Sequence, residues 1–578
     1  MGVLLKVNKS NTYILYLHLS QPSHFTSLHF TLLKLDGSYK QYGNLKKIVL
    51  KFTTLSESGY DAPSFTVGTT GARVGRDMEN EVSVPSDVKL APMCHATIKY
   101  RDGFFYLVDS GLSFGAGIRI TTGSKHWELV RDAFFSAGTS IFRSTGIEKV
   151  PGGDDALRVE VMEGPLKGEI MVIGKGGGSI GRSSDNSICI PDKELSRKHS
   201  AIVFDERTGK YFIQDVGSTN GTYMLLTGAN KGPYRLNLND HIVVGRTGFS
   251  INRYDYGIAE EIGYRQTMED SCVIVQDLGV IPLCRSVQDQ YAPQSFFGVF
   301  DGHGGANASK YLSKHLHVNV ADGLAAITPD ILKTLEYTRD EKMGSDEMKG
   351  EGGYTTQSEQ REIIDNLVKD MLKSTFLQTD KSFLTESEHC ENGSTATTVL
   401  LLGQRLYCAN VGDSRSLLCR KFKPFALSED HKPSREDEAK RIRDSGGFVI
   451  NNRVMGELAV SRAFGDSEFK KGIQSIIQEE GIKVDAEETT NWDDPLIIAE
   501  PEFVTTTLTP DDQFLVLACD GLFDVFTPAD LIDYIKNFLE KNGGDVQKCT
   551  QSLTYEAIRK RNSRDNVSVI LILLNKWF

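Results

Sequence analysis

The segment SFFGVFDGHGGANASKYL, residues 295–312, holds the first indication of the fold. Residues 296–300 form an apolar run with the composition of a buried strand, and the run stops at Asp301. Gly302, His303 and two more glycines follow before a helix-like segment begins. Glycine permits backbone conformations that other residues avoid. The stretch therefore predicts a strand, a tight turn and a helix, with a carboxylate and an imidazole in the turn.

Other carboxylates stand where apolar runs start or stop. They are Glu269, Asp270, Asp413, Asp520 and Asp565. Carboxylates gathered at one edge of a sheet repel one another unless a cation neutralises them. Oxygen ligands without a His or Cys cluster favour a hard divalent ion, Mg²⁺ or Mn²⁺, over zinc. We therefore expect a metal site with Asp301 among its ligands.

Length and composition narrow the class of protein. A chain of 578 residues is too long for one core and predicts two to four domains. Its net charge of -12 argues against nucleic-acid binding. Nine cysteines without a CxxC pair suit reduced thiols, which predicts a cytoplasmic or nuclear location. No apolar run approaches the ~18 residues of a membrane span, so we expect none.

The chain changes character near residue 256. Strand-like runs then alternate with amphipathic segments, such as residues 363–376, which predicts a mixed α and β domain over residues 256–578. In TPADLIDYIKNFL, Thr527 is placed to cap a helix with Pro528 at its first position. Residues 336–360 and 478–494 are polar and are expected to be surface insertions.

Residues before 256 contain one repeat. ARVGRDMENEVSVP (72–85) resembles GSIGRSSDNSICIP (178–191), and the offset between Gly75 and Gly181 is 106 residues. Short alternating runs separated by Gly, Asp and Ser turns are typical of a β-sandwich. We expect a segment of residues 1–45, then two side-by-side all-β sandwiches over residues 46–145 and 157–253.

The downstream half resembles the metal-dependent type 2C protein Ser/Thr phosphatases over about residues 256–575. The blocks GYRQTMED, FFGVFDGHGG, GSTATTVLL, CANVGDSRS, EDHKP, NNRVMGELAVSRAFGD, LACDGLFDV and SRDNVSVIL occur in the family's order. The resemblance implies a central β-sandwich flanked by helices, with two Mg²⁺ or Mn²⁺ ions at one end of the sheets. It implies that Asp301 bridges the ions, that Gly302 offers its carbonyl, and that Asp520 and Asp565 bind the first ion. Glu269 would hold water on the second ion, and Asp413 with Asp520 matches a weaker third site.

Two further residues receive catalytic roles from the same resemblance. Arg265 matches an arginine that grips the substrate phosphate. His303 matches the general acid, which protonates the leaving Ser or Thr oxygen, and an imidazole pKa near 6.5 suits that task. Two neighbouring cations activate water and clamp the attacking and leaving oxygens, so no covalent phosphoenzyme and no reactive cysteine are needed.

The second repeat resembles a forkhead-associated domain, a β-sandwich that reads phosphothreonine with loops at one end. Arg182 and Ser196 match the phosphate contacts, His199 matches a residue that braces the loops, and Thr219 and Asn220 match the last recognition loop. An arginine fork suits phosphate because it donates paired charge-assisted hydrogen bonds. The resemblance implies recruitment to phosphorylated proteins, a protein kinase among the candidate partners.

The first repeat departs from that pattern. Arg76 and His95 remain, but Pro92 stands in the place of Ser196 and Phe114 in the place of Asn220. Neither replacement can supply the matching hydrogen bonds. We expect a degenerate copy that packs, spaces or binds an unphosphorylated partner.

The expected function is metal-dependent hydrolysis of phosphoserine and phosphothreonine in proteins, with recruitment by the second repeat. The module order resembles the kinase-associated protein phosphatases of plants, without a membrane anchor. Two alternatives are a pseudophosphatase scaffold and a phosphopeptide-binding adaptor with slow hydrolysis. The scaffold predicts a lost metal ligand, and Asp301, Asp520 and Asp565 are all present. Comparing turnover of a bound phosphoprotein with that of a small aryl phosphate would separate the adaptor.

Overall fold

The structure is a computed structural model of the chain. It describes residues 2–8, 11–16, 31–35, 47–53, 64–111, 115–120, 127–149, 154–280, 294–336, 357–470 and 494–575. Most of the two expected polar insertions, and Phe114, lie outside these ranges. Near the N-terminus, β1 (Gly2–Asn8), β2 (Asn11–Tyr16) and β3 (Thr31–Leu35) form an antiparallel sheet. No helix within the described ranges has the length and apolar character needed to cross a membrane.

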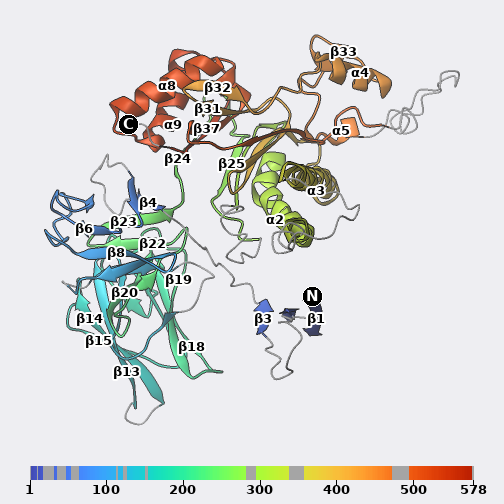
Figure 1. Ribbon diagram of the computed structural model, residues 1–578. Helices are drawn as coiled ribbons and strands as arrows, with labels where there is room; N and C mark the ends of the chain where they lie inside the picture. Colours follow the sequence, from blue (N-terminus) through green and yellow to red (C-terminus); the bar gives the residue numbers. More distant parts are fainter. Residues whose placement is uncertain are drawn as a thin grey trace, which may run out of the picture.

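Two β-sandwiches occupy residues 47–252 (Figure 1). The first core lies among β4 (Lys47–Thr53), β5 (Phe65–Gly68), β6 (Ala72–Gly75), β7 (Val82–Ser83), β8 (Ala96–Arg101), β9 (Phe104–Asp109), β10 (Ala116–Arg119), β21 (Tyr234–Arg235), β22 (His241–Val244) and β23 (Thr247–Asn252). The second lies among β11 (Trp127–Glu128), β12 (Ala133–Ala137), β13 (Ser140–Lys149), β14 (Asp155–Glu163), β15 (Ile170–Ile173), β16 (Gly178–Gly181), β17 (Ile188–Cys189), β18 (Ser200–Asp205), β19 (Lys210–Asp215) and β20 (Thr222–Gly228). The predicted all-β sandwich character of this half agrees with the structure.

The pairing of these strands differs from the expected boundaries at 46–145 and 157–253. β23 pairs with β4, with Ser250 opposite Lys51, and β13 pairs with β14. Accordingly, Phe249 is buried in the first core and Phe142 in the second. The two repeats have exchanged their last three strands, so β21–β23 complete the first sandwich and β11–β13 the second. Both copies share one alternating pattern, and that pattern does not specify which copy a strand completes.

The two sandwiches share one sheet. β10 of the first pairs antiparallel with β20 of the second, with Ile118 opposite Met224. This pairing joins the two sets into a ten-stranded sheet of order β15-β14-β13-β12-β20-β10-β22-β23-β4-β5. A continuous ladder of backbone hydrogen bonds therefore connects the two repeats.

The first sandwich is fixed to the downstream half by polar contacts. Lys51 Nζ donates to the carbonyl oxygen of Tyr256 at 2.6 Å and lies 4.3 Å from the centre of its ring. Gln276, which is 3% exposed, donates to Asn252 at 2.7 Å and to Asn239 at 3.1 Å. Its side-chain oxygen accepts from the backbone N–H of Arg253 at 2.6 Å. Buried polar contacts whose hydrogen bonds are all satisfied hold the first sandwich in one orientation relative to the downstream half.

Two five-stranded sheets stack face to face in residues 255–573. One sheet has the order β24 (Asp255–Glu261), β38 (Val567–Leu573), β37 (Asp512–Ala518), β31 (Arg415–Arg420) and β32 (Lys423–Ala426). The other has the order β25 (Ser271–Val275), β26 (Gln294–Phe300), β29 (Ala396–Leu402), β30 (Arg405–Val411) and β36 (Glu502–Thr507). Phe297 and Val399 of one sheet share a buried cluster with Leu515 and Ile570 of the other.

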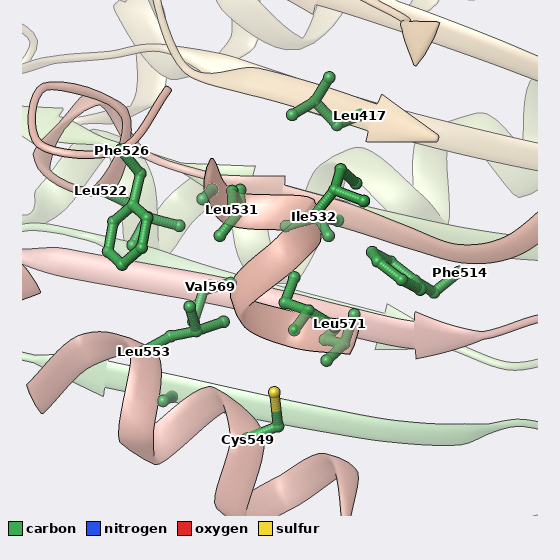
Figure 2. Close-up of a cluster of buried hydrophobic side chains, with 14 of the residues drawn as sticks. Leu417, Phe514, Leu522, Phe526, Leu531, Ile532, Cys549, Leu553, Val569 and Leu571 are labelled. Atoms are coloured by element: carbon green, nitrogen blue, oxygen red, sulfur yellow. The ribbon is translucent and has the colours of Figure 1, made fainter. Parts of the chain in front are cut away.

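Helices cover both outer faces of this β-sandwich (Figure 1). The long helices α2 (Asn307–Glu336) and α3 (Gln357–Glu386) share a core with β26 and β29. On the opposite face α7 (Asp520–Phe523), α8 (Pro528–Lys541), α9 (Val546–Tyr555) and the π-helix η1 (Glu556–Lys560) cover β37 and β38. Figure 2 shows Leu531 and Leu553 from these helices beside Val569 and Leu571 of the sheet. The predicted α+β sandwich flanked by helices is what the structure has.

The remaining elements of this half are short. They are β27 (Gly302–His303), β28 (Gly393–Ser394), α4 (Glu436–Asp444), β33 (Val449–Ile450), β34 (Arg453–Val454), β35 (Phe464–Gly465) and α5 (Ser467–Lys470). The predicted cap of α8 is confirmed, because the side chain of Thr527 accepts from the N–H of Asp530 at 3.2 Å and Pro528 opens the helix.

Candidate metal centre and phosphate-reading loops

Carboxylates from both sheets meet at one end of the downstream sandwich. Asp301 follows β26 and Asp413 follows β30, while Asp520 follows β37 across the sandwich. Oxygens of these three side chains all lie within 4.8 Å of one another. Backbone pairing explains the gathering, because each strand delivers its carboxylate to the same edge. The structure thus brings together three of the residues that sequence reasoning assigned to a metal.

The protein alone does not offset the negative charges of these buried carboxylates. Burial, reinforced by neighbouring carboxylates, raises the pKa of Asp301 well above its ordinary value. The same causes raise the pKa of Asp520 to about 7 and that of Asp270 to about 6. All donors are hard oxygens, and a divalent cation would relieve the repulsion. The residues present therefore fit the expected Mg²⁺ or Mn²⁺.

A tight loop brings Glu269 and Gly302 to the same edge. A Cβ on Gly302 would lie 2.3 Å from the carbonyl oxygen of Glu269, so only glycine fits there. The N–H of Glu269 donates to the side chain of Asn566 at 2.9 Å, and Asn566 also donates to the carbonyls of Ile262 and Thr267. Asn566 therefore holds this loop against the start of β38, next to Asp565.

Arg265 lies on this loop and reaches the carboxylate group. Its Nη2 donates to Asp565 Oδ2 at 2.6 Å, and its side chain is 56% exposed. An exposed guanidinium that contacts a candidate metal ligand is well placed to receive a phosphate from solvent. Arg265 and Asp565 thus lie together at this edge, and their roles remain predictions.

His303 is held by a carboxylate that sequence reasoning missed. Its Nε2 lies 2.8 and 2.9 Å from the two carboxylate oxygens of Asp466. Burial alone would lower the pKa of His303, but the hydrogen bond and charge of Asp466 outweigh it and raise the pKa. A Cβ on Gly393 would lie 2.1 Å from His303 Nε2, so this glycine leaves room for the pair. The signal in the sequence was the acid that ends the block SRAFGD.

The second sandwich gathers its recognition loops at one end. The N–H of Thr219 donates to Ser196 Oγ at 3.1 Å, and Asn220 Nδ2 donates to the carbonyl of Glu194 at 2.8 Å. The N–H of Arg182 donates to the carbonyl of Ser196 at 3.2 Å, and the Arg182 side chain is exposed. The four residues expected to read phosphothreonine therefore lie on three loops that bond to one another.

Two side chains beneath these loops hold them in place. The buried His199 accepts at Nδ1 from the N–H of Ser196, 3.1 Å away, and its Nε2 lies 3.0 Å from the carbonyl oxygen of Gly221. Arg119 comes from β10 of the first sandwich and donates to the carbonyls of Ser218 and Thr219 at 3.2 and 3.4 Å. The first repeat therefore supports the recognition loop of the second.

In the first sandwich the equivalent loops have a different composition. The N–H of Arg76 donates to the carbonyl of Ala91 at 3.1 Å, and that of Asp77 donates to the carbonyl of Pro92 at 2.9 Å. Met78 and Met93 on these loops are 84% and 71% exposed. The matching bonds of the second repeat run from Arg182 to Ser196 and from Ser183 to Arg197, so the expectation that Pro92 holds the place of Ser196 was wrong: Ala91, which also lacks a hydroxyl, stands there.

Comparison with known proteins matches a family model to each half of the chain. The family model described as protein phosphatase 2C matches residues 254–567. The chain belongs to the protein phosphatase 2C family. It is accordingly a hydrolase of the protein serine/threonine phosphatase class. The model described as FHA domain matches residues 178–245, a range that runs from β16 of the second core into β22 of the first.

Several curated members of the protein phosphatase 2C family are similar to this chain. Integrin-linked kinase-associated serine/threonine phosphatase 2C of Bos taurus is 33% identical over 345 residues, which cover 56% of this chain and 77% of that protein. Probable protein phosphatase 2C 22 of Arabidopsis thaliana is 32% identical, covering 55% and 68%. Protein phosphatase 2C homolog 3 of Schizosaccharomyces pombe is 33% identical, covering 58% and 67%.

Proposed function

We propose that the phosphatase half hydrolyses phosphoserine and phosphothreonine in proteins, with Mg²⁺ or Mn²⁺ held by Asp301, Gly302, Glu269, Asp520 and Asp565 and a weaker third ion near Asp413. The observation that carries the proposal is the convergence of Asp301, Asp413 and Asp520 within 4.8 Å at the edge of two sheets. Two cations held by these residues would activate water and stabilise the attacking and leaving oxygens.

The chain's own groups bind and orient the substrate. Arg265, beside Asp565, donates to the phosphate oxygens and holds the phosphorus in line for attack. His303 donates a proton to the Ser or Thr oxygen as its bond to phosphorus breaks. Asp466 fixes the imidazole ring and stabilises its protonated form.

The second sandwich recruits phosphothreonine-bearing proteins in this proposal. Support comes from the exposed Arg182 beside Ser196, Thr219 and Asn220. Binding one phosphothreonine there raises the effective concentration of other phosphosites near the metal centre. Cytoplasmic or nuclear action on phosphorylated signalling proteins, a kinase among them, follows as the expected setting.

The test is hydrolysis of a phosphothreonine peptide and of p-nitrophenyl phosphate, with EDTA and then with excess Mn²⁺. We expect EDTA to abolish both activities and Mn²⁺ to restore them. Asp301→Asn should lower activity by at least about 100-fold and leave the fold intact, because the site lies at the mouth of the sheets. Undiminished hydrolysis in EDTA would refute the metal mechanism, and no hydrolysis under any condition would favour the scaffold alternative.

A further inference from the structure

An aromatic and basic patch adjoins the metal centre. Tyr264 is 49% exposed, and the guanidinium carbons of Arg559 and Arg564 lie 5.4 and 5.3 Å from the centre of its ring. Both arginines are exposed, and within the described part of the chain no carboxylate lies in ion-pair range of either. Arg561, by contrast, turns to Asp530 and Glu556 at 3.9 Å. We call Tyr264, Arg559 and Arg564 the basic shelf.

The basic shelf is joined to the phosphate site through consecutive residues. Tyr264 precedes Arg265, and Arg564 precedes Asp565. Arg265 and Asp565 are hydrogen-bonded at 2.6 Å, and the residues just before each of them make the cation–π contact. Consecutive Cα atoms are about 3.8 Å apart. A substrate chain whose phosphate lies at Arg265 therefore passes the shelf within a few residues.

Local backbone geometry sets this region apart. Arg559 lies in η1, a π-helical turn that extends α9. π-helical turns are rare, widen the helix by one residue per turn and often occur at functional sites. Here the turn ends in Arg559 and Lys560, both exposed, on a chain whose net charge is -12. An acidic substrate thus meets local positive charge on an otherwise acidic protein.

We propose that the basic shelf selects phosphoprotein segments with acidic groups, carboxylates or a second phosphate, within a few residues of the phosphoresidue to be hydrolysed. Guanidinium groups pair with such oxyanions through charge-assisted hydrogen bonds, and exposed Tyr and Arg side chains are frequent energetic centres of interfaces. The proposal rests on the phosphatase function of the adjoining metal site and names its preferred substrates.

The experiment compares phosphothreonine peptides whose flanking residues are Glu, Ala or Lys, and a fourth peptide with a second phosphothreonine three residues away. We expect kcat/KM of the full chain to be about three- to tenfold higher for the Glu and doubly phosphorylated peptides than for the Ala peptide, mainly through KM. The Glu and doubly phosphorylated arms separate carboxylate from phosphate recognition. Salt of about 0.5 M should remove most of the preference.

Arg559→Glu should abolish or reverse the preference, because it replaces the attracting charge by a repelling one. Lys541→Glu is the matched control: it is an exposed reversal in α8 of the same domain, and the preference should persist. No preference in the unchanged protein, or an equal preference in Arg559→Glu, would overturn the proposal. Hydrolysis of p-nitrophenyl phosphate reports the metal centre separately. If nothing is hydrolysed, fluorescence anisotropy of the Glu and Ala peptides in EDTA makes the same comparison by binding.

Discussion

An experiment can distinguish the exchange of strands between the two sandwiches from a conventional tandem, in which each repeat folds by itself. Phe142 in β13 and Phe249 in β23 hold equivalent places in the two repeats. Phe142 is fully buried in the second core, where its ring stacks on Phe135 at 4.7 Å. Phe249 is fully buried in the first core, where its ring lies 4.9 Å from Phe52.

The perturbation is Phe142→Ala, with Phe249→Ala as its partner variant. Truncating a buried Phe to Ala costs about 3–5 kcal/mol. A tenfold change in an equilibrium corresponds to about 1.4 kcal/mol, so local opening of the affected sandwich should become about 100- to 4,000-fold more frequent. In the exchanged arrangement Phe142→Ala weakens residues 155–228, although it precedes them in sequence, and Phe249→Ala weakens residues 47–119.

The assay is hydrogen exchange of the full chain, read by mass spectrometry over each sandwich. Phe142→Ala should speed exchange in β14 and β18 and leave β4 and β8 near the level of the unchanged protein. A phosphothreonine peptide should also bind Phe142→Ala more weakly. Conventional domains would give the reverse pattern, with Phe142→Ala loosening β4 and β8 and sparing the phosphothreonine loops. That reverse pattern would refute the exchange.

Three further predictions concern binding, catalysis and acid stability. Arg182→Ala should weaken phosphothreonine peptide binding by roughly ten- to a hundredfold in titration calorimetry, since charge-assisted bonds contribute about 1.5–3 kcal/mol, while Arg76→Ala should change nothing. Arg265→Ala should mainly raise KM, whereas His303→Ala should mainly lower kcat. The loss in His303→Ala should be smallest for p-nitrophenyl phosphate, because its leaving group needs no proton. An equal loss on p-nitrophenyl phosphate and on a phosphothreonine peptide would contradict the general acid role of His303. Burial alone would raise the pKa of Glu438, but the arginine side chains that contact it lower that pKa to about 2. The ionised Glu438 therefore stabilises the fold above about pH 4.5, and this stabilisation is lost as the pH falls toward 2. In acid unfolding, Glu438→Gln should remove up to about 2 kcal/mol of this pH dependence, and an unchanged pH profile would contradict the assignment.

Much of the phosphatase half could be predicted from sequence because its signals are local. An apolar run that ends in Asp301 or Asp520 needs only strand direction to place the carboxylate at a sheet edge. The partners of those residues were harder to foresee. Asp466 reaches His303 across 163 positions, and Asn566 reaches Glu269 across 297. Such contacts depend on how the loops fold back over the sheets, and the spacing of residues in the sequence does not predict that.

The sandwich half was harder because its two copies are alike. Sequence comparison identified the repeats and their period, but not which copy each late strand completes. Alternation specifies that Phe142 and Phe249 face a core, and both cores would accept either ring. The two copies differ in the contacts that they make outside the repeats, such as that of Lys51 with Tyr256.

The exchange gives the degenerate first repeat a function that its own loops do not have. Its β10 carries Arg119 under Ser218 and Thr219, so the loop that would read phosphothreonine is supported from the other copy. Its β4, paired with β23, places Lys51 against the phosphatase half. Loss of phosphate-binding groups from the first repeat leaves both tasks intact, because neither uses the loops where Pro92 stands. The first repeat thus links the candidate phosphothreonine loops of the second repeat to the phosphatase half through one continuous sheet and the contact of Lys51.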